Sequence, residues 1–151
     1  MSIEQFYTRE KANSGIKMPL YLPTGGKSEH WLMLRGVDSD AFREAKTEGE
    51  REAAEIAAIK DAKERNEAMR ASQRRLVSSL VSAWSFEQEC TREAVEDLFL
   101  NAPQIMDAVD KVVSNRAIFF AIGSASLNAM PSNNSGSTKS RKGQRARSGK
   151  A

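Results

Sequence analysis

The sequence has little of what structural cross-links and metal sites require. It contains one cysteine, Cys90, and one histidine, His30. A single cysteine excludes an internal disulfide, and a single histidine excludes a histidine-based metal cluster. The longest strictly apolar run, Ala117 to Ile122, is much shorter than the roughly 18 residues that suggest a membrane span. The first ten residues include acidic side chains, unlike a secretory signal. We therefore expect a soluble protein of a reducing cytoplasm.

Acidic residues are also missing from the end of the chain. The whole sequence has 23 basic and 20 acidic residues, a formal net charge of +3. Residues 128–151, here called the basic tail, consist mainly of Ser, Asn, Gly and basic residues, a composition that predicts disorder. Without the six basic residues of this tail, 17 basic residues stand against 20 acidic ones, so the rest of the chain is mildly acidic. The six residues are Lys139, Arg141, Lys142, Arg145, Arg147 and Lys150.

The part of the chain that follows the first 15 residues predicts a β-hairpin. Residues 1–15 mix charged and aromatic residues without a clear period, and we treat them as an N-terminal arm. Ile16 to Leu22 and His30 to Val37 are strand-like, and the PTGGK segment between them has the proline and glycines of a turn. Pro19 predicts that the first strand lies at a sheet edge. A two-stranded sheet is marginal, so the hairpin must pack on another element.

A long charged helix is predicted next, from Asp40 to Trp84. Ser39 or Asp38 can cap its first turn, and pairs such as Arg51–Glu55 stand at helical i,i+4 spacing. Gly49 is the one position at which we expect an interruption. The middle of this segment has few large apolar residues, which is typical of a solvated arm or of half a weak coiled coil.

A helical core is predicted after Leu76. Its first apolar stripe consists of Leu76, Val77, Leu80, Val81 and Trp84, at helical spacing. Thr91 can cap a short helix, and Pro103 suits the first turn of the next one. The predicted fold class is mainly α (α+β): a small helical domain with an N-terminal β-hairpin, one long charged helix and a disordered basic tail. The predicted segments are 1–15, 16–37, 38–75, 76–127 and 128–151.

None of the candidate chemical motifs predicts an enzyme. Thr24 to Ser28, TGGKS, resembles the end of a phosphate loop, but Tyr21 stands where the pattern needs glycine and a strand follows the loop. His30 has no partner at a sensible ligand spacing, and Cys90 has no partner histidine. The acidic residues of the long helix alternate with basic ones, as on a solvated helical face. We expect no catalytic residue, no cofactor and no metal.

The stretch from Leu76 to Phe120 resembles the tail assembly chaperones of long-tailed bacteriophages. Their plan has a helix ending in a tryptophan, here Trp84, and then an acidic connector and a short helix. An N-A-P-x-I element follows, here Asn101 to Ile105, and the last helix ends near N-R, here Asn115–Arg116. The segment Leu34 to Phe42, LRGVDSDAF, is similar to the N-terminal part of the same group.

The resemblance covers residues 16–122, and the charged segment Glu44 to Arg74 is longer than its plan requires. It implies a non-enzymatic protein of the host cytoplasm that binds the tape measure protein and keeps it soluble while tail tube subunits polymerise around it. It also implies absence from the mature virion. In this family a translational frameshift often produces a longer form whose extra domain recruits the tail tube protein. The Gly149–Lys150 codons are a candidate slippery site.

A protein that holds a helical partner needs an apolar surface with a polar rim. The core segment has more large side chains than a small core obviously needs, and we expect the tentative partner-binding residues among them, with Phe119 and Phe120 the most exposed. These residues are Trp84, Phe86, Leu98, Phe99, Ile118, Phe119 and Phe120.

Three alternatives stay open at this point. The protein could be a small nucleic-acid-binding protein acting through the basic tail, with loose phosphate contacts and no sequence readout. It could also be a minor structural protein of the virion. The sequence leaves a homo-oligomer open as well.

Overall fold

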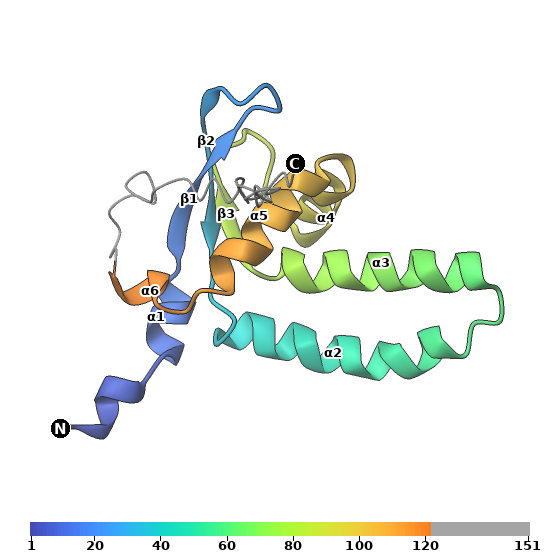
Figure 1. The fold of residues 1–151 in the computed structure, drawn as a ribbon, viewed down its shortest axis with the longest axis horizontal. Helices are drawn as coiled ribbons and strands as arrows, with labels where there is room; N and C mark the ends of the chain where they lie inside the picture. Colours follow the sequence, from blue (N-terminus) through green and yellow to red (C-terminus); the bar gives the residue numbers. More distant parts are fainter. Residues whose placement is uncertain (122–151) are drawn as a thin grey trace, which may run out of the picture.

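The computed structural model describes residues 1–121, and its centre is a three-stranded antiparallel sheet (Figure 1). The strands are β1 (Ile16–Tyr21), β2 (Lys27–Leu34) and β3 (Val81–Trp84), in the order β1-β2-β3. The register pairs Ile16 with Leu34 and Leu32 with Trp84. The predicted hairpin is thus confirmed, and β1 is an edge strand as Pro19 indicated.

The TGGKS segment is not a phosphate loop: Thr24 to Gly26 lie in the hairpin turn, and Lys27 and Ser28 already belong to β2. The Leu22 amide donates to the Gly26 carbonyl over 2.8 Å, and the Gly25 amide donates to the Leu22 carbonyl over 2.8 Å. Gly25 has a φ of 90°, a backbone conformation that glycine adopts without steric cost. The segment leads directly into β2, so there is no helix start behind it to hold a phosphate.

The N-terminal residues form a short 3₁₀ helix, η1 (Ile3–Phe6), and the helix α1 (Arg9–Ser14). Ala12 of α1 is buried, and its carbonyl accepts a hydrogen bond from the Gly36 amide over 2.9 Å. Helix α6 (Ile118–Ala121) lies against α1 near the Ile16 end of the sheet (Figure 1). The first residues of the chain are therefore tied to the last described ones.

The charged segment forms two antiparallel helices, α2 (Asp40–Ala57) and α3 (Ala62–Ser78), that project from the sheet (Figure 1). The prediction of one helix from Asp40 to Trp84 is wrong in this respect. The break lies at residues 58–61 and not at Gly49, which stays helical. Asp61 caps α3 by accepting a hydrogen bond from the Glu64 amide over 3.4 Å. This Asp-x-x-Glu start signal is present in the sequence, but neither glycine nor proline marks the stop before it.

The second correction concerns residues 79–84, which the apolar stripe assigned to a helix. Helix α3 ends at Ser78, and the chain continues as β3 along the free edge of β2. The Arg35 amide donates to the Leu80 carbonyl over 2.6 Å, and the Ser85 amide donates to the Trp31 carbonyl over 3.2 Å. A strand edge that satisfies these backbone groups outcompetes local helical periodicity.

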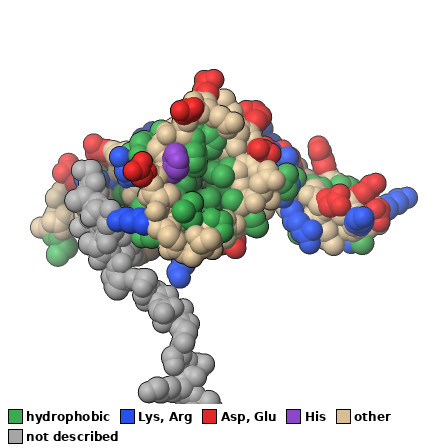
Figure 2. Space-filling model, turned by 90° about the horizontal axis from the view of Figure 1, so that it is seen from above, with side chains coloured by type: hydrophobic (Ala, Val, Ile, Leu, Met, Phe, Trp, Pro, Cys, Tyr) green, Lys and Arg blue, Asp and Glu red, His purple; other side chains and the backbone are tan. Residues whose placement is uncertain are grey.

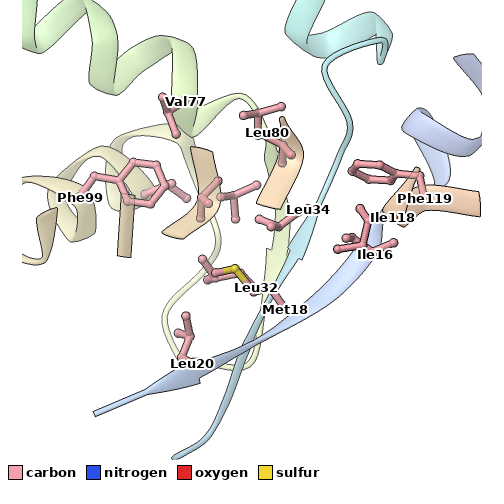
Figure 3. Close-up of a cluster of buried hydrophobic side chains, with 14 residues drawn as sticks. Ile16, Met18, Leu20, Leu32, Leu34, Val77, Leu80, Phe99, Ile118 and Phe119 are labelled. Atoms are coloured by element: carbon pink, nitrogen blue, oxygen red, sulfur yellow. The ribbon is translucent and has the colours of Figure 1, made fainter. Parts of the chain in front are cut away.

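Two helices cover one face of the sheet: α4 (Arg92–Asn101) and α5 (Pro103–Val113). Thr91 caps α4 by accepting from the Ala94 amide over 3.1 Å, and Pro103 opens α5, both as predicted. Their inner sides meet the sheet in one hydrophobic cluster (Figure 3). Its buried members are Ile16, Met18, Leu20, Leu32, Leu34, Val77, Leu80, Val81, Val95, Phe99, Val109, Val113, Ile118 and Phe119. The predicted fold class, mainly helical with a small sheet, is confirmed.

Candidate partner-binding surfaces

The seven residues that the sequence grouped as partner-binding separate into buried and accessible ones. Phe99, Ile118 and Phe119 are between 1% and 5% exposed and belong to the core. The expectation that Phe119 is exposed is therefore wrong; its ring lies near Ile16 in the cluster (Figure 3). Trp84, Phe86 and Leu98 are half-buried at the edge of that core. Phe120 is 47% exposed, in agreement with the expectation.

Three rings form an aromatic group at the end of β3, here called the connector cluster: His30, Trp84 and Phe86. The His30 and Phe86 rings stack with centroids 4.5 Å apart, and the Trp84 and Phe86 rings meet edge to face at 5.2 Å. These are favourable geometries for aromatic pairs. Figure 2 shows the single histidine on the surface, with hydrophobic side chains gathered around it. The cluster thus combines aromatic rings, two of them largely apolar, with access to solvent.

Hydrogen bonds hold the segment that carries the connector cluster. The indole Nε1 of Trp84 donates to the Gln88 carbonyl over 2.7 Å. The Ser85 hydroxyl oxygen accepts from the Trp31 amide at 2.9 Å and lies 3.0 Å from His30 Nδ1. A recognition surface whose rings are already held in place loses less entropy when a partner binds.

Phe120 lies in a different part of the molecule. It belongs to α6, near the Ile16 end of the sheet, and borders a small pocket together with Thr8, Gly36 and Arg116. The connector cluster lies beside the first half of β2, the half nearer the hairpin turn. The sequence groups Phe120 with Trp84 and Phe86 as partner-binding residues, but the structure places Phe120 apart from the other two.

An ion-pair centre anchors α6 and the start of α2. Asp38 accepts from Arg116 Nε over 2.8 Å and from Arg43 over 2.8 Å. The hydrogen bond from Arg116 is the main reason that the pKa of Asp38 lies well below its usual range, and Arg43 adds to it while partial burial opposes it. The Asp38 carboxylate is 15% exposed, so these contacts are partly shielded from solvent.

A groove between α2 and α3, here called the arm groove, was not found from the sequence. It has a volume of about 490 Å³. Ala53, Ile56 and Ala57 line it from α2, and Met69 and Leu76 line it from α3. Met69 is 56% exposed. The spacing of these residues is helical, but it becomes a groove only when the chain folds back at residues 58–61.

The remaining chemical candidates have ordinary surroundings. Cys90 is half-buried, and this burial raises the pKa of its thiol while Arg35 opposes the shift, so the thiol is not activated. Across residues 1–121, no group of three or more potential metal ligands comes together. In the same part of the chain, no helix has the length and hydrophobicity to cross a membrane. The six basic residues of the tail lie outside the described residues.

Apolar and aromatic surfaces of this kind are typical of proteins that bind other proteins. Residues 11–115 match the family model described as phage tail assembly chaperone. This range is more than half of the chain, and the chain belongs to that family. The matched range includes the charged segment 44–74, although this segment is longer than the general plan described for the family in the sequence analysis. Comparisons with curated proteins and with solved structures find no match.

Proposed function

We propose that this protein binds the tape measure protein of a phage tail, keeps it soluble and supports the polymerisation of the tail tube around it. Membership of the tail assembly chaperone family supports partners among the tail proteins and a role without catalysis. On this proposal the protein acts in the host cytoplasm during assembly and is absent from the finished particle. Mass spectrometry of purified virions should therefore not detect it, and its recovery at structural stoichiometry would favour a virion subunit.

The connector cluster is the surface that best fits such a partner, and it is the observation that carries this part of the proposal. An amphipathic helix presents an apolar stripe, and the half-buried rings of Trp84 and Phe86 can accept it without new unsatisfied polar groups. Glu87 and Glu89 are exposed beside the rings and supply an acidic rim. The expected binding segment is therefore an amphipathic helix whose apolar stripe is flanked by basic residues.

Co-expression with the tape measure protein tests this surface. Phe86→Ser should move the tape measure protein into the insoluble fraction, because it removes the ring that joins His30 and Trp84. Phe120→Ser is the matched control, since it removes the same ring at the other end of the sheet. Circular dichroism should show both variants folded. If the partner stays soluble with folded Phe86→Ser and precipitates with Phe120→Ser, the surface around α6 is the binding site instead.

The longer form remains part of the proposal. A frameshift at Gly149–Lys150 would use the basic tail as a tether to an added domain that recruits the tail tube protein. The gene's nucleotides test this directly: a slippery run at these codons and an open second frame beyond them are required. Codons without such a run would remove the idea.

The nucleic-acid-binding alternative makes an opposite prediction. Deletion of Ser132 to Ala151 removes all six basic residues of the tail. The chaperone proposal expects solubilisation of the tape measure protein to persist, whereas the alternative expects retention on DNA to be lost. Two results together would favour the alternative: the full chain binds DNA and the deletion abolishes this binding, and the tape measure protein is insoluble whether or not the full chain is co-expressed.

A further inference from the structure

The arm formed by α2 and α3 is held together with little burial. Ala45 and Val77 are buried where the arm meets the body, but none of residues 46–76 is buried. Most of the stability of a helix in a protein comes from the packing of an apolar face, and over most of their 18 and 17 residues α2 and α3 bury no side chain. The arm groove exposes apolar side chains along this face, and the residues lining it all come from α2 and α3. The arm therefore has one apolar face that other described residues leave uncovered.

The two helices of the arm carry opposite charges. Helix α2 has six acidic and three basic residues, a net charge of −3, and α3 has two acidic and five basic residues, a net charge of +3. Within one chain this brings Arg75 to Glu52, with 2.5 Å between nitrogen and oxygen. Each helix is thus electrostatically suited to a neighbour with the composition of the other.

We propose that the arm groove is the interface of a homodimer, in which two arms form an antiparallel four-helix bundle. The twofold axis runs parallel to the helices, so that α2 of one copy faces the partner's α3. Each helix then has only antiparallel, oppositely charged neighbours, and Ile56, Met69 and Leu76 of both copies form the core. A twofold axis across the helices would place α2 against the partner's α2, with like charges opposed. This inference does not depend on the proposed function.

The size of the face is sufficient for such a dimer. An 18-residue helix is about 27 Å long and two packed helices are about 20 Å wide, so each copy offers roughly 540 Å² before side chains interdigitate. Two copies bury roughly 1,100 Å² in total, which is at the lower end of specific interfaces. A second copy also places an oppositely charged helix against both α2 and α3, whereas a single foreign helix complements the charge of only one of them.

Adjacent alanines on α2 provide a matched test. Ala53 and Ala54 are both exposed in the single chain, but only Ala53 lines the arm groove. We expect the full chain to sediment as a dimer, with twice the chain mass of 16.7 kDa. Ala53→Glu should raise the dimer dissociation constant by at least about 100-fold, because it places a carboxylate in the apolar core. Ala54→Glu makes the same change outside the groove and should shift it by less than about threefold.

Sedimentation equilibrium over about 1 to 100 µM measures both constants. A wild-type chain that stays monomeric over this range overturns the proposal, and so does a dimer that Ala53→Glu leaves intact. A monomer whose groove instead binds a tape measure segment, with Ala53→Glu abolishing that binding, also overturns it and assigns the groove to a different occupant.

The orientation is tested by crosslinking at the tip of the arm. A chain with Cys90→Ser and Ala58→Cys has one thiol, next to the turn between α2 and α3. With the axis parallel to the helices, the two tips lie together and a short bismaleimide should join the copies. With the opposite axis the tips are about 27 Å apart, and a dimer that does not crosslink contradicts the proposed arrangement.

Discussion

The body and the arm of this protein are stabilised by different physical means. In the body, the sheet and the helices α4 and α5 enclose side chains such as Leu32, Phe99 and Val109 that are at most 1% exposed. In the arm, residues 46–76 include none that is buried, and the helices rely on the Ser39 and Asp61 caps and on Glu52–Arg75. Burial of apolar area contributes far more free energy than caps and exposed ion pairs.

This difference indicates which part of the chain is adaptable. The body defines one packing arrangement, since a close-packed core tolerates little change in volume. The arm can lose or exchange side chains at small cost, because its free energy of folding is spread over weak local terms. A region of this kind is suited to contacts with other molecules. The following predictions measure the contrast, from the largest expected effect to the smallest.

The largest effect is expected for Phe99→Ala in the body. The ring is 1% exposed, and its removal leaves a cavity between α4 and the sheet. The free energy of unfolding should fall by about 3–5 kcal/mol. Urea denaturation followed by circular dichroism measures this loss. Ile56→Ala in the arm is the comparison. Measured at a protein concentration too low for association through the arm, it should cost less than about 1.5 kcal/mol, since Ile56 is only half-buried in the single chain. Equal losses at both positions would contradict the division.

The same substitution should have opposite signs at two glycines. Gly15 precedes β1 with φ 79° and ψ −179°, a conformation almost restricted to glycine, and an added Cβ would collide with the Leu34 carbonyl oxygen. Gly15→Ala should therefore destabilise the fold by about 2–3 kcal/mol. Gly49 lies inside α2 with open space where its Cβ would be. Gly49→Ala should stabilise it by up to about 1 kcal/mol.

Thermal and urea melts of the two glycine variants test this pair of signs. The measurements belong at low protein concentration, where association through the arm does not contribute. A destabilising Gly49→Ala would show that the arm requires glycine there for its own packing.

A smaller effect, with a defined pH dependence, is expected at Asp38. Arg116 and Arg43 lower its pKa, so the carboxylate adds stability above its unfolded pKa of about 4, and this contribution is lost as the pH falls below that value. Asp38→Asn should cost about 1–2 kcal/mol at neutral pH, discounted because both arginines are more than half exposed. The variant should also show a weaker acid dependence of stability below pH 4.

Asp40→Asn is the control for Asp38. Asp40 pairs with Arg9 at the protein surface, with more than half of both side chains exposed. Its removal should have a smaller effect on the acid transition. An acid transition that Asp38→Asn leaves unchanged would show that other carboxylates dominate it.

The smallest effect is expected in the arm, for Glu52→Gln. This change removes the charge that pairs with Arg75 between α2 and α3. Both side chains are about 40% exposed, so the loss should be below about 1 kcal/mol and should vanish in 1 M salt. Melts at low and high salt measure it. A loss as large as that of a core residue would show that the arm depends on this pair.

Several local features were predictable because their signals lie within a few residues. The hairpin turn, the Thr91 cap of α4 and the Pro103 start of α5 follow from backbone chemistry that neighbouring residues supply. The membership of the core was also largely predictable, since Val77, Leu80 and Val81 are buried as their apolar stripe indicated. For these residues burial was predicted correctly although part of the stripe is a strand.

The accessible surfaces were less predictable. Phe119 and Phe120 are adjacent phenylalanines, yet Phe119 is buried and Phe120 is 47% exposed. Only the direction in which α6 enters the core separates them. The arm groove requires a chain reversal that neither proline nor glycine marks, although the Asp61 to Glu64 start signal was available.

The sequence by itself determined the element types of most segments, the caps and the set of apolar residues that must leave water. These depend on local hydrogen bonding and on periodicity along the chain. Only the tertiary structure decided that the charged segment folds back on itself, that residues 81–84 pair with β2, and that Trp84 and Phe86 stay accessible while Phe99 and Phe119 do not. Those outcomes depend on which surfaces distant segments offer one another, a property that no short stretch of the chain contains.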